Sequence, residues 1–354
     1  MLYIPQEILD IIIGYATAGS PERYLSSISH TFHQIALPYK FKSLTFQNRS
    51  REGSPDVPIP KFCEAINAGD THALSLVPLV QELSLLMWGG IPNLSDHFLQ
   101  EPFKKIINSV LSFRNLTKLT MRNCVTSPTS MEQLGKLVQL QSLHTWLCRV
   151  EEYTFGNKVS YDALSNLQSL HTLGCDADSN YFGSQLACIS MKNLQILKSG
   201  DKAVTEALLS TDPPVQLKEL YFTYIYDVDY SLLWNYLARV TSLTHLSLPD
   251  LRPPVPDSIP SLVFSHPELQ YLHIHVGLAP HFADQPMKEM EIVTESGPSH
   301  LIIAEVRQCW QGIVFPHVEH LKTDRVSWGT DKIPIEFWRE FLLNVKTVQL
   351  PGIH

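Results

Sequence analysis

Two histidines and two cysteines stand at matching places in a hexapeptide that occurs twice. The segment LQSLHT begins at residue 140 and again at residue 167, so His144 and His171 occupy the same position. Cys148 and Cys175 follow four residues later in the two copies. Imidazole and thiolate groups are typical zinc ligands. The elements that carry these side chains decide whether they can converge on a metal.

The hexapeptide belongs to a longer repeat of the form L-x-x-L-x-L. Copies begin at residues 80, 116, 140, 167, 194, 217, 243, 269, 287, 318 and 345. Most of the spacings lie in the range of roughly 20 to 29 residues that leucine-rich repeats show. The copies at 287 and 318 fit this frame least well.

Segments between the copies have apolar residues that recur every three or four positions, which predicts helices at 98–113, 202–210, 229–240 and 335–345. A strand and a helix in each repeat predict an α/β fold, a leucine-rich-repeat solenoid with a parallel sheet on the concave side and helices on the convex side. We expect the array to cover residues 62–354, after a loop at 47–61 that is rich in proline, glycine and charge. A capping strand is expected at 40–46.

Side chains alternate between the two faces of a strand, so the leucines at positions one, four and six of the frame should face the core. Positions three, five and seven should face solvent, and His144 and His171 stand at position five. Cys148 and Cys175, together with Cys124 at the same ninth position, should point inward and bond the backbone. The two histidines then lack a third ligand. We therefore expect no metal and no cofactor.

Motifs of catalysis are missing from the sequence. It contains no GxSxG, P-loop, HExxH or GxGxxG pattern. A gently concave sheet also lacks the enclosed pocket in which chemistry is shielded from water. We expect no catalytic residues and no enzymatic activity.

The exposed positions of the middle repeats are rich in aromatic and histidine side chains, which are frequent anchors of protein interfaces. The frame also places Ser247 and His275 on this face. A protein or peptide target of unknown identity is one interpretation of this strip, and a solvated sheet face with scattered aromatic residues is the other. The predicted target-binding residues are His144, Trp146, His171, Tyr221, Tyr271 and His273.

The N-terminal segment carries more apolar surface than it can bury by itself. Residues 8–15 are apolar at six of eight positions. Helices are predicted at 2–16 and 21–36, and about 40 residues hide too small a fraction of their surface to cover these side chains. Ile8, Leu9, Ile11, Ile12 and Ile13 point to more than one side of the first helix. A partner protein is expected to cover the remainder.

The segments IPQEILDIIIGYA and YLSSISHTFHQIALPYKFKSLTF resemble an F-box over residues 1–46. With the array behind it, the chain resembles F-box proteins of the leucine-rich-repeat type, which are substrate receptors of cullin-RING ubiquitin ligases. The resemblance implies that a Skp-type adaptor of a cullin complex docks on the helices and that the repeats hold a target for ubiquitination. The alternative is a leucine-rich-repeat interaction scaffold not linked to ubiquitin, in which the helices only cap the array. The adaptor-binding residues implied by the resemblance are Ile4, Pro5, Ile8, Leu9, Ile12, Leu25 and Ile28.

Composition limits the other classes of function. The chain has 354 residues, 44% of them hydrophobic, and a net charge of -8 from 27 basic and 35 acidic residues. An excess of acidic residues argues against nucleic acid and anionic membranes as partners. No stretch reaches the roughly 20 apolar residues that cross a bilayer. Six irregularly spaced cysteines without a CxxC pair fit a reducing compartment, so we expect a cytoplasmic or nuclear protein.

Overall fold

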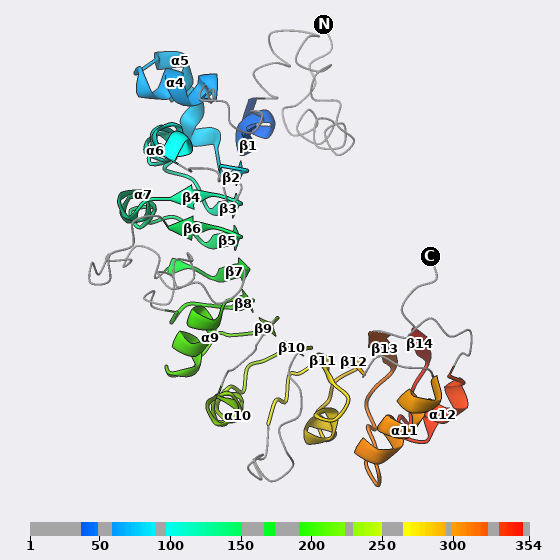
Figure 1. Cartoon of the computed structure of the whole chain (residues 1–354). Helices are drawn as coiled ribbons and strands as arrows, with labels where there is room; N and C mark the ends of the chain where they lie inside the picture. The colour runs from blue at the N-terminus through cyan, green and yellow to red at the C-terminus, as the bar shows by residue number, and fades with distance from the viewer. Residues whose placement is uncertain are drawn as a thin grey trace, which may run out of the picture. The chain divides into compact units, whose positions relative to one another are not determined.

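The computed structural model describes residues 37–48, 59–88, 97–150, 166–173, 191–223, 229–249, 265–294, 299–324 and 333–349. These residues form two units, one with the described residues up to Asn166 and one with those from Leu167 onward. In each unit parallel strands lie side by side in chain order, and the helices that connect one strand to the next lie on one side of them (Figure 1).

The first unit contains a parallel sheet in the order β1-β2-β3-β5 and a small second sheet formed by β4 and β6. Its strands are β1 (Ser43–Gln47), β2 (Glu82–Leu86), β3 (Lys118–Arg122), β4 (Val125–Thr126), β5 (Ser142–Trp146) and β6 (Arg149–Val150). Its helices are α4 (Lys61–Asn67), α5 (Thr71–Leu76), the 3-10 helix η1 (Val77–Leu79), α6 (His97–Val110) and α7 (Pro128–Leu134).

The second unit contains a parallel sheet in the order β7-β8-β9-β10-β11-β12-β13-β14, and its helices lie on the convex side of the strands (Figure 1). Its strands are β7 (Ser169–Leu173), β8 (Ile196–Ser199), β9 (Glu219–Phe222), β10 (His245–Leu248), β11 (Tyr271–His275), β12 (Glu289–Val293), β13 (His320–Asp324) and β14 (Thr347–Gln349). Its helices are α9 (Lys202–Leu209), α10 (Tyr230–Arg239), the 3-10 helix η4 (Ala279–Phe282), α11 (Ser299–Cys309) and α12 (Ile335–Arg339).

The repeat frame predicts the strands residue by residue. Each copy of L-x-x-L-x-L gives a strand that starts at the third position of the frame, as at Lys118 for the copy that begins at 116. The two copies that fit least well also form strands, and β12 and β13 are paired from Glu289↔His320 to Val293↔Asp324. The expected capping strand is β1, which pairs with β2, but it begins at Ser43 rather than at residue 40 and follows a helical turn at 37–42. The fold is a leucine-rich-repeat solenoid of the α/β class.

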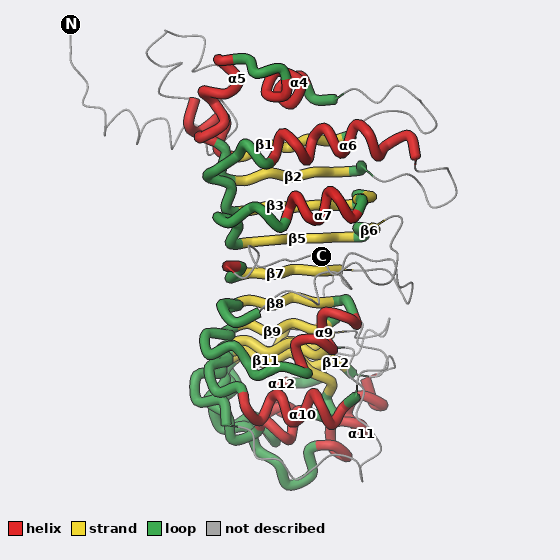
Figure 2. Tube along the Cα trace, turned by 90° about the vertical axis from the view of Figure 1, so that its left-hand side faces the viewer, coloured by secondary structure: helices red, strands yellow, loops and turns green. Residues whose placement is uncertain are grey.

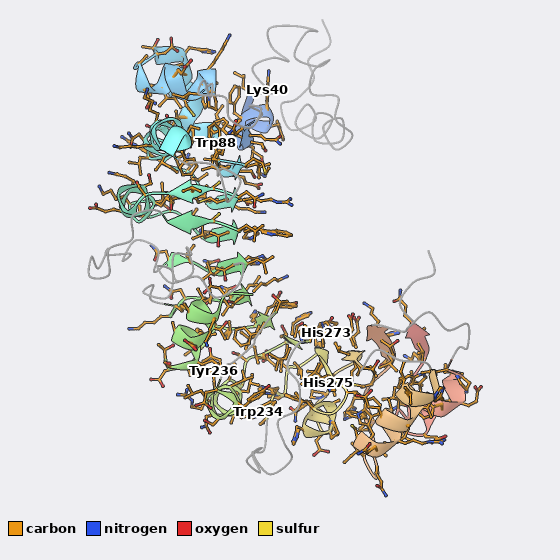
Figure 3. All side chains as sticks on the ribbon, viewed as in Figure 1. Lys40, Trp88, Trp234, Tyr236, His273 and His275 are labelled. Atoms are coloured by element: carbon orange, nitrogen blue, oxygen red, sulfur yellow. The ribbon has the colours of Figure 1, made fainter. Side chains whose placement is uncertain are left out.

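The core of each unit lies between the strands and the helices. Frame positions one, four and six are buried, as Leu116, Leu119 and Met121 show in the first unit. Helix α10 supplies Trp234 and Tyr236, whose side chains have no exposed surface (Figure 3). Burying an apolar side chain such as Leu116 or Met121 stabilises the fold by roughly 1.5–3 kcal/mol. The regular leucine spacing is thus the pattern of buried positions.

Three of the four predicted helices match α6, α9 and α10 to within about three residues at each end. The fourth is shorter than predicted, because α12 ends at Arg339 and the chain continues in turns. Leu342 and Val345 are buried in these turns. The apolar spacing at 335–345 therefore marks buried positions rather than one continuous helix. Helices α4, α5, α7 and α11 were not singled out from the sequence, although Figure 2 shows α7 and α11 beside the strands like the others.

The thiols at the ninth frame position are structural, as predicted for the two that the structure describes. Cys124 and Cys148 are buried, and Cys124 Sγ donates a hydrogen bond to the carbonyl oxygen of Leu85 at 3.3 Å. Burial raises the pKa of Cys124 well above its usual range. Burial also acts to raise the pKa of Cys148, but the hydrogen bonds around this thiol together outweigh burial and lower its pKa. Cys175 lies outside the described residues.

Candidate functional site

The exposed face of the sheet in the second unit is built from two rows of side chains. Register pairing aligns equal frame positions of neighbouring strands, so the third positions form one row and the fifth positions another. The third-position row is Ser169, Ile196, Glu219, His245, Tyr271, Glu289, His320 and Thr347. The fifth-position row is His171, Lys198, Tyr221, Ser247, His273, Glu291, Lys322 and Gln349.

In the first unit, the solvent-exposed side of the sheet carries an exposed tryptophan. The Trp146 side chain is 46% exposed, and the guanidinium carbon of Arg122 lies 4.7 Å from the centre of its ring. The two residues are register partners in β3 and β5. His144 lies two residues before Trp146 and its Nε2 shares a hydrogen bond of 3.1 Å with the hydroxyl of Ser142. His144 and Trp146 therefore belong to one surface, as the frame predicts.

Tyr221 and Tyr271 lie at the centre of the second unit's exposed face. The ammonium nitrogen of Lys198 lies 4.3 Å from the centre of the Tyr221 ring. The Tyr271 hydroxyl donates a hydrogen bond of 2.8 Å to Oε2 of Glu291. Burial and the adjacent Glu219 raise the pKa of Tyr221 to about 12, and burial together with Glu291 raises the pKa of Tyr271 further. Both phenols thus stay protonated, and each lies beside a glutamate carboxylate.

Two side chains that the frame places in solvent are buried. Ser247 is only 4% exposed because it is a small residue between Tyr221 and His273 on the neighbouring strands. Its hydroxyl shares a hydrogen bond of 3.1 Å with Nδ1 of His273. His275 is 8% exposed, because it ends β11 at a turn and its Nε2 lies 3.9 Å from a carboxylate oxygen of Glu305 on α11. Neither side chain is therefore an exposed anchor on this face.

The predicted target-binding residues fall into two groups. His144 and Trp146 lie in the first unit, whereas His171, Tyr221, Tyr271 and His273 lie in the second. Within the second unit Tyr221, Tyr271 and His273 come together over β9 to β11, and His171 lies two strands before Tyr221. The adaptor-binding residues Ile4, Pro5, Ile8, Leu9, Ile12, Leu25 and Ile28 lie outside the described residues.

Several polar residues of the face were missed as site candidates. Glu289 and Glu291 flank Tyr271 and His273 in register, and Tyr271 bonds Glu291 directly. They belong to the copy MKEMEI at 287, which is one of the two copies that fit the frame least well, and the choice of aromatic and histidine side chains as site candidates passed over its glutamates. The signal was present nevertheless, since the two glutamates stand at positions three and five of that copy.

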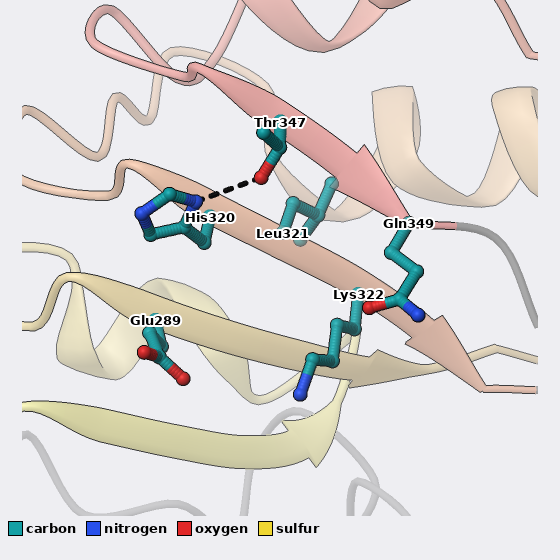
Figure 4. A pocket seen from close by; sticks show the side chains of 6 residues that line it. All are labelled: Glu289, His320, Leu321, Lys322, Thr347 and Gln349. Atoms are coloured by element: carbon teal, nitrogen blue, oxygen red, sulfur yellow. Dashed lines mark hydrogen bonds between the residues drawn. The ribbon is translucent and has the colours of Figure 1, made fainter.

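A hollow of about 280 Å³ lies over the last three strands of the second unit (Figure 4). Nδ1 of His320 and the hydroxyl of Thr347 share a hydrogen bond of 2.7 Å at its side. The lining is mostly polar, and the hollow is open to solvent. The lining residues are Glu289, His320, Leu321, Lys322, Thr347 and Gln349.

Two further observations concern metals and membranes. Among the residues that the structure describes, no three histidine, cysteine or acidic side chains are grouped so that they could hold a metal ion. In the same described ranges, no helix has both the length and the apolar character needed to cross a membrane.

Comparison with known proteins gives no match to a family model and no match to a curated protein. Similar solved structures include internalin F of Listeria monocytogenes, with 14% identity, 84% of this chain and 78% of that chain covered, and a TM-score of 0.38. The Rad7 and Elc1 complex of yeast gives 15% identity, 99% and 84% coverage and a TM-score of 0.41. A leucine-rich-repeat protein of Leptospira interrogans gives 17% identity, 89% and 87% coverage and a TM-score of 0.27.

Proposed function

We propose that this chain is a protein-binding receptor whose repeats hold a target protein and whose N-terminal segment docks a Skp-type adaptor of a cullin ubiquitin ligase. The target-binding role of the repeats is supported by the exposed sheet face and its aromatic side chains. Trp146 in the first unit and Tyr221 and Tyr271 in the second are held in place by Arg122, Lys198 and Glu291. Anchors that are already ordered lose little side-chain entropy when a partner binds.

The adaptor half of the proposal is supported by the sequence of the first 46 residues. The F-box-like pattern and the isoleucines at 8, 11, 12 and 13 favour an apolar docking helix. In this role the chain performs no chemistry itself. It brings the target close to the ubiquitin-transfer machinery, which raises the effective concentration of the target's lysines.

Co-purification with a Skp-type adaptor tests the proposal. The wild-type chain should retain the adaptor, and the variant Ile8→Asp with Ile12→Asp should lose it, because two carboxylates would be buried in an apolar interface. The matched control is Leu74→Asp with Leu301→Asp, which makes the same change at two exposed leucines on helices α5 and α11. This control should retain the adaptor as the wild type does.

The alternative of a plain interaction scaffold makes the opposite prediction. A wild-type chain that fails to retain the adaptor, or an Ile8 and Ile12 variant that retains it fully, would contradict the ligase half of the proposal. The target-binding half would then stand as the function of the repeats alone, with the N-terminal helices acting as a cap.

A further inference from the structure

The part of the exposed face that lies over β9 to β12 is acidic and aromatic. Eight side chains occupy the third and fifth frame positions of these four strands, and they include three glutamates, two tyrosines and two histidines but no lysine or arginine. We call this set the acidic strip. Its members are Glu219, Tyr221, His245, Ser247, Tyr271, His273, Glu289 and Glu291.

The carboxylates of the acidic strip take part in none of the ion pairs among the residues that the structure describes. These carboxylates belong to Glu219, Glu289 and Glu291. Glu291 accepts the hydrogen bond of Tyr271, which fixes its position and leaves its negative charge in place. Three carboxylates on one partly buried face favour a cationic partner.

The tyrosines of the strip are suited to the same partner. The ring of Tyr221 already receives the ammonium group of Lys198 at 4.3 Å, so the face of the ring attracts a cation in this setting. The raised pKa values of Tyr221 and Tyr271 have burial as their first cause and the neighbouring glutamates as the second. The glutamates act through their negative charge, and the same charge attracts a guanidinium or ammonium group.

We propose that the acidic strip binds a basic, extended segment of the target protein that runs across strands β9 to β12. This inference rests on the proposed target-binding role of the repeats and names the chemistry of the target. Arginine fits best, because its planar cation can stack on a tyrosine ring while it donates hydrogen bonds to a carboxylate.

Strand spacing gives the expected pattern of charges in the target. Neighbouring strands lie about 4.8 Å apart, so Glu219 on β9 and Glu289 on β12 are separated by three spacings, about 14 Å. An extended peptide advances about 3.3 Å per residue, so two basic residues four positions apart span about the same distance. The peptide residue midway between these two basic residues then lies near Tyr271 and His245.

Lysines bound the strip on both sides. Lys198 on β8 and Lys322 on β13 occupy the fifth frame position of the strands that flank it. A longer run of basic residues would therefore meet like charges beyond the four strands. The favoured target segment has two or three basic residues within about five positions. Neutral or acidic residues flank it on both sides.

Fluorescence anisotropy with the purified full-length chain tests this proposal. The probe is a fluorescein-labelled, glycine- and serine-based peptide with two arginines four residues apart. Two control peptides replace both arginines with glutamate or place them next to each other. The wild-type chain should bind the first peptide, bind the adjacent-arginine peptide more weakly and fail to bind the glutamate peptide.

Matched charge variants separate the acidic strip from the general negative charge of the chain. The test variant is Glu219→Gln, Glu289→Gln and Glu291→Gln, which should weaken binding of the arginine peptide at least tenfold. The control variant makes the same number of charge changes at exposed glutamates on helices α4, α9 and α12, and should bind within twofold of the wild type. The control substitutions are Glu64→Gln, Glu206→Gln and Glu336→Gln.

Three outcomes overturn the proposal: no binding of the arginine peptide by the wild type, equal binding of the glutamate peptide, or equal loss in both charge variants. Equal thermal midpoints of the two variants show that a difference in binding does not come from unfolding. The Ile8→Asp and Ile12→Asp variant should keep the peptide affinity of the wild type. A wild-type chain that fails to retain the adaptor but binds the arginine peptide contradicts only the ubiquitin-ligase role, and a wild-type chain that retains the adaptor but does not bind the peptide contradicts only the acidic strip.

Discussion

Trp88 and Cys124 occupy the same position in successive repeats and donate hydrogen bonds to equivalent carbonyl oxygens. Nε1 of Trp88 donates to the carbonyl oxygen of Phe46 at 2.9 Å, and Sγ of Cys124 donates to that of Leu85 at 3.3 Å. Phe46 and Leu85 are register partners in β1 and β2. The ninth frame position therefore links each of these repeats to the strand before it, with an indole in one repeat and a thiol in the next.

Replacement of Trp88 by phenylalanine should lower the free energy of unfolding by about 1–2 kcal/mol. The substitution removes a buried hydrogen bond, which contributes about 0.5–1.5 kcal/mol, and part of a fully buried ring. Urea unfolding followed by circular dichroism measures the change. Trp146→Phe is the matched control and should leave the midpoint unchanged, since Trp146 is exposed. Equal midpoints for Trp88→Phe and the wild type would contradict a stabilising role of this bond.

Ionisation of Cys63 should lower the free energy of unfolding at alkaline pH. The thiol is fully buried on α4, and burial raises its pKa from 9.0 to about 12. The folded chain keeps this thiol protonated while the unfolded chain ionises it, so its contribution is complete below pH 9.0 and falls as the pH rises toward about 12. The slope for one such group is about 1.4 kcal/mol per pH unit.

Cys63→Ala should therefore show a shallower decrease of unfolding free energy with pH than the wild type between those two pH values. Denaturant unfolding at several pH values measures the two slopes, and the lysines and tyrosines that also titrate contribute equally to both chains. Parallel slopes would show that ionisation of Cys63 is not coupled to folding.

The fold was predictable because the repeated leucines mark buried positions directly. Leu116, Leu119 and Met121 belong to a spacing that recurs in every repeat, and the strand begins at the third position each time. The role of Trp88 was not predicted, because the ninth position was recognised only where cysteine occupies it. The indole N–H makes the same kind of hydrogen bond as the thiol, and the relevant property is a buried donor rather than a residue type.

The sequence predicted which strand positions form the exposed face, but it did not predict how far solvent reaches each side chain there. Alternation along a strand places Ser247 and His275 on the same side as Tyr221, yet the size of the neighbouring side chains and a covering helix decide whether solvent reaches them. These are properties of other strands and of α11, which the frame of a single repeat does not contain. The acidic side chains Glu289 and Glu291 were missed for another reason, since the predicted anchors were chosen among aromatic and histidine residues.

Glu219 should control the ionisation of Tyr221. The pKa of Tyr221 is raised to about 12 by burial first and by the adjacent carboxylate second, so Glu219→Gln should lower it. Ultraviolet absorbance of the phenolate, titrated with base in the wild type and in Tyr221→Phe, isolates the signal of this residue from the other tyrosines. Glu336→Gln is the control and should leave the titration of Tyr221 where it is. An unchanged pKa in Glu219→Gln would show that burial alone acts on Tyr221.

Trp146 should be an anchor for a partner rather than a structural residue. Its ring is 46% exposed and its contact with Arg122 is a surface cation–π pair, worth about 0.5–1 kcal/mol. A double-mutant cycle with Arg122→Ala and Trp146→Ala should give a coupling energy within that range, measured by urea unfolding. Under the proposed function, Trp146→Ala should also reduce capture of the target at least fivefold while the unfolding free energy falls by less than about 1 kcal/mol. A loss of stability above about 2 kcal/mol would place Trp146 among the core residues, and an exposed aromatic anchor would no longer explain the target-binding face of the first unit.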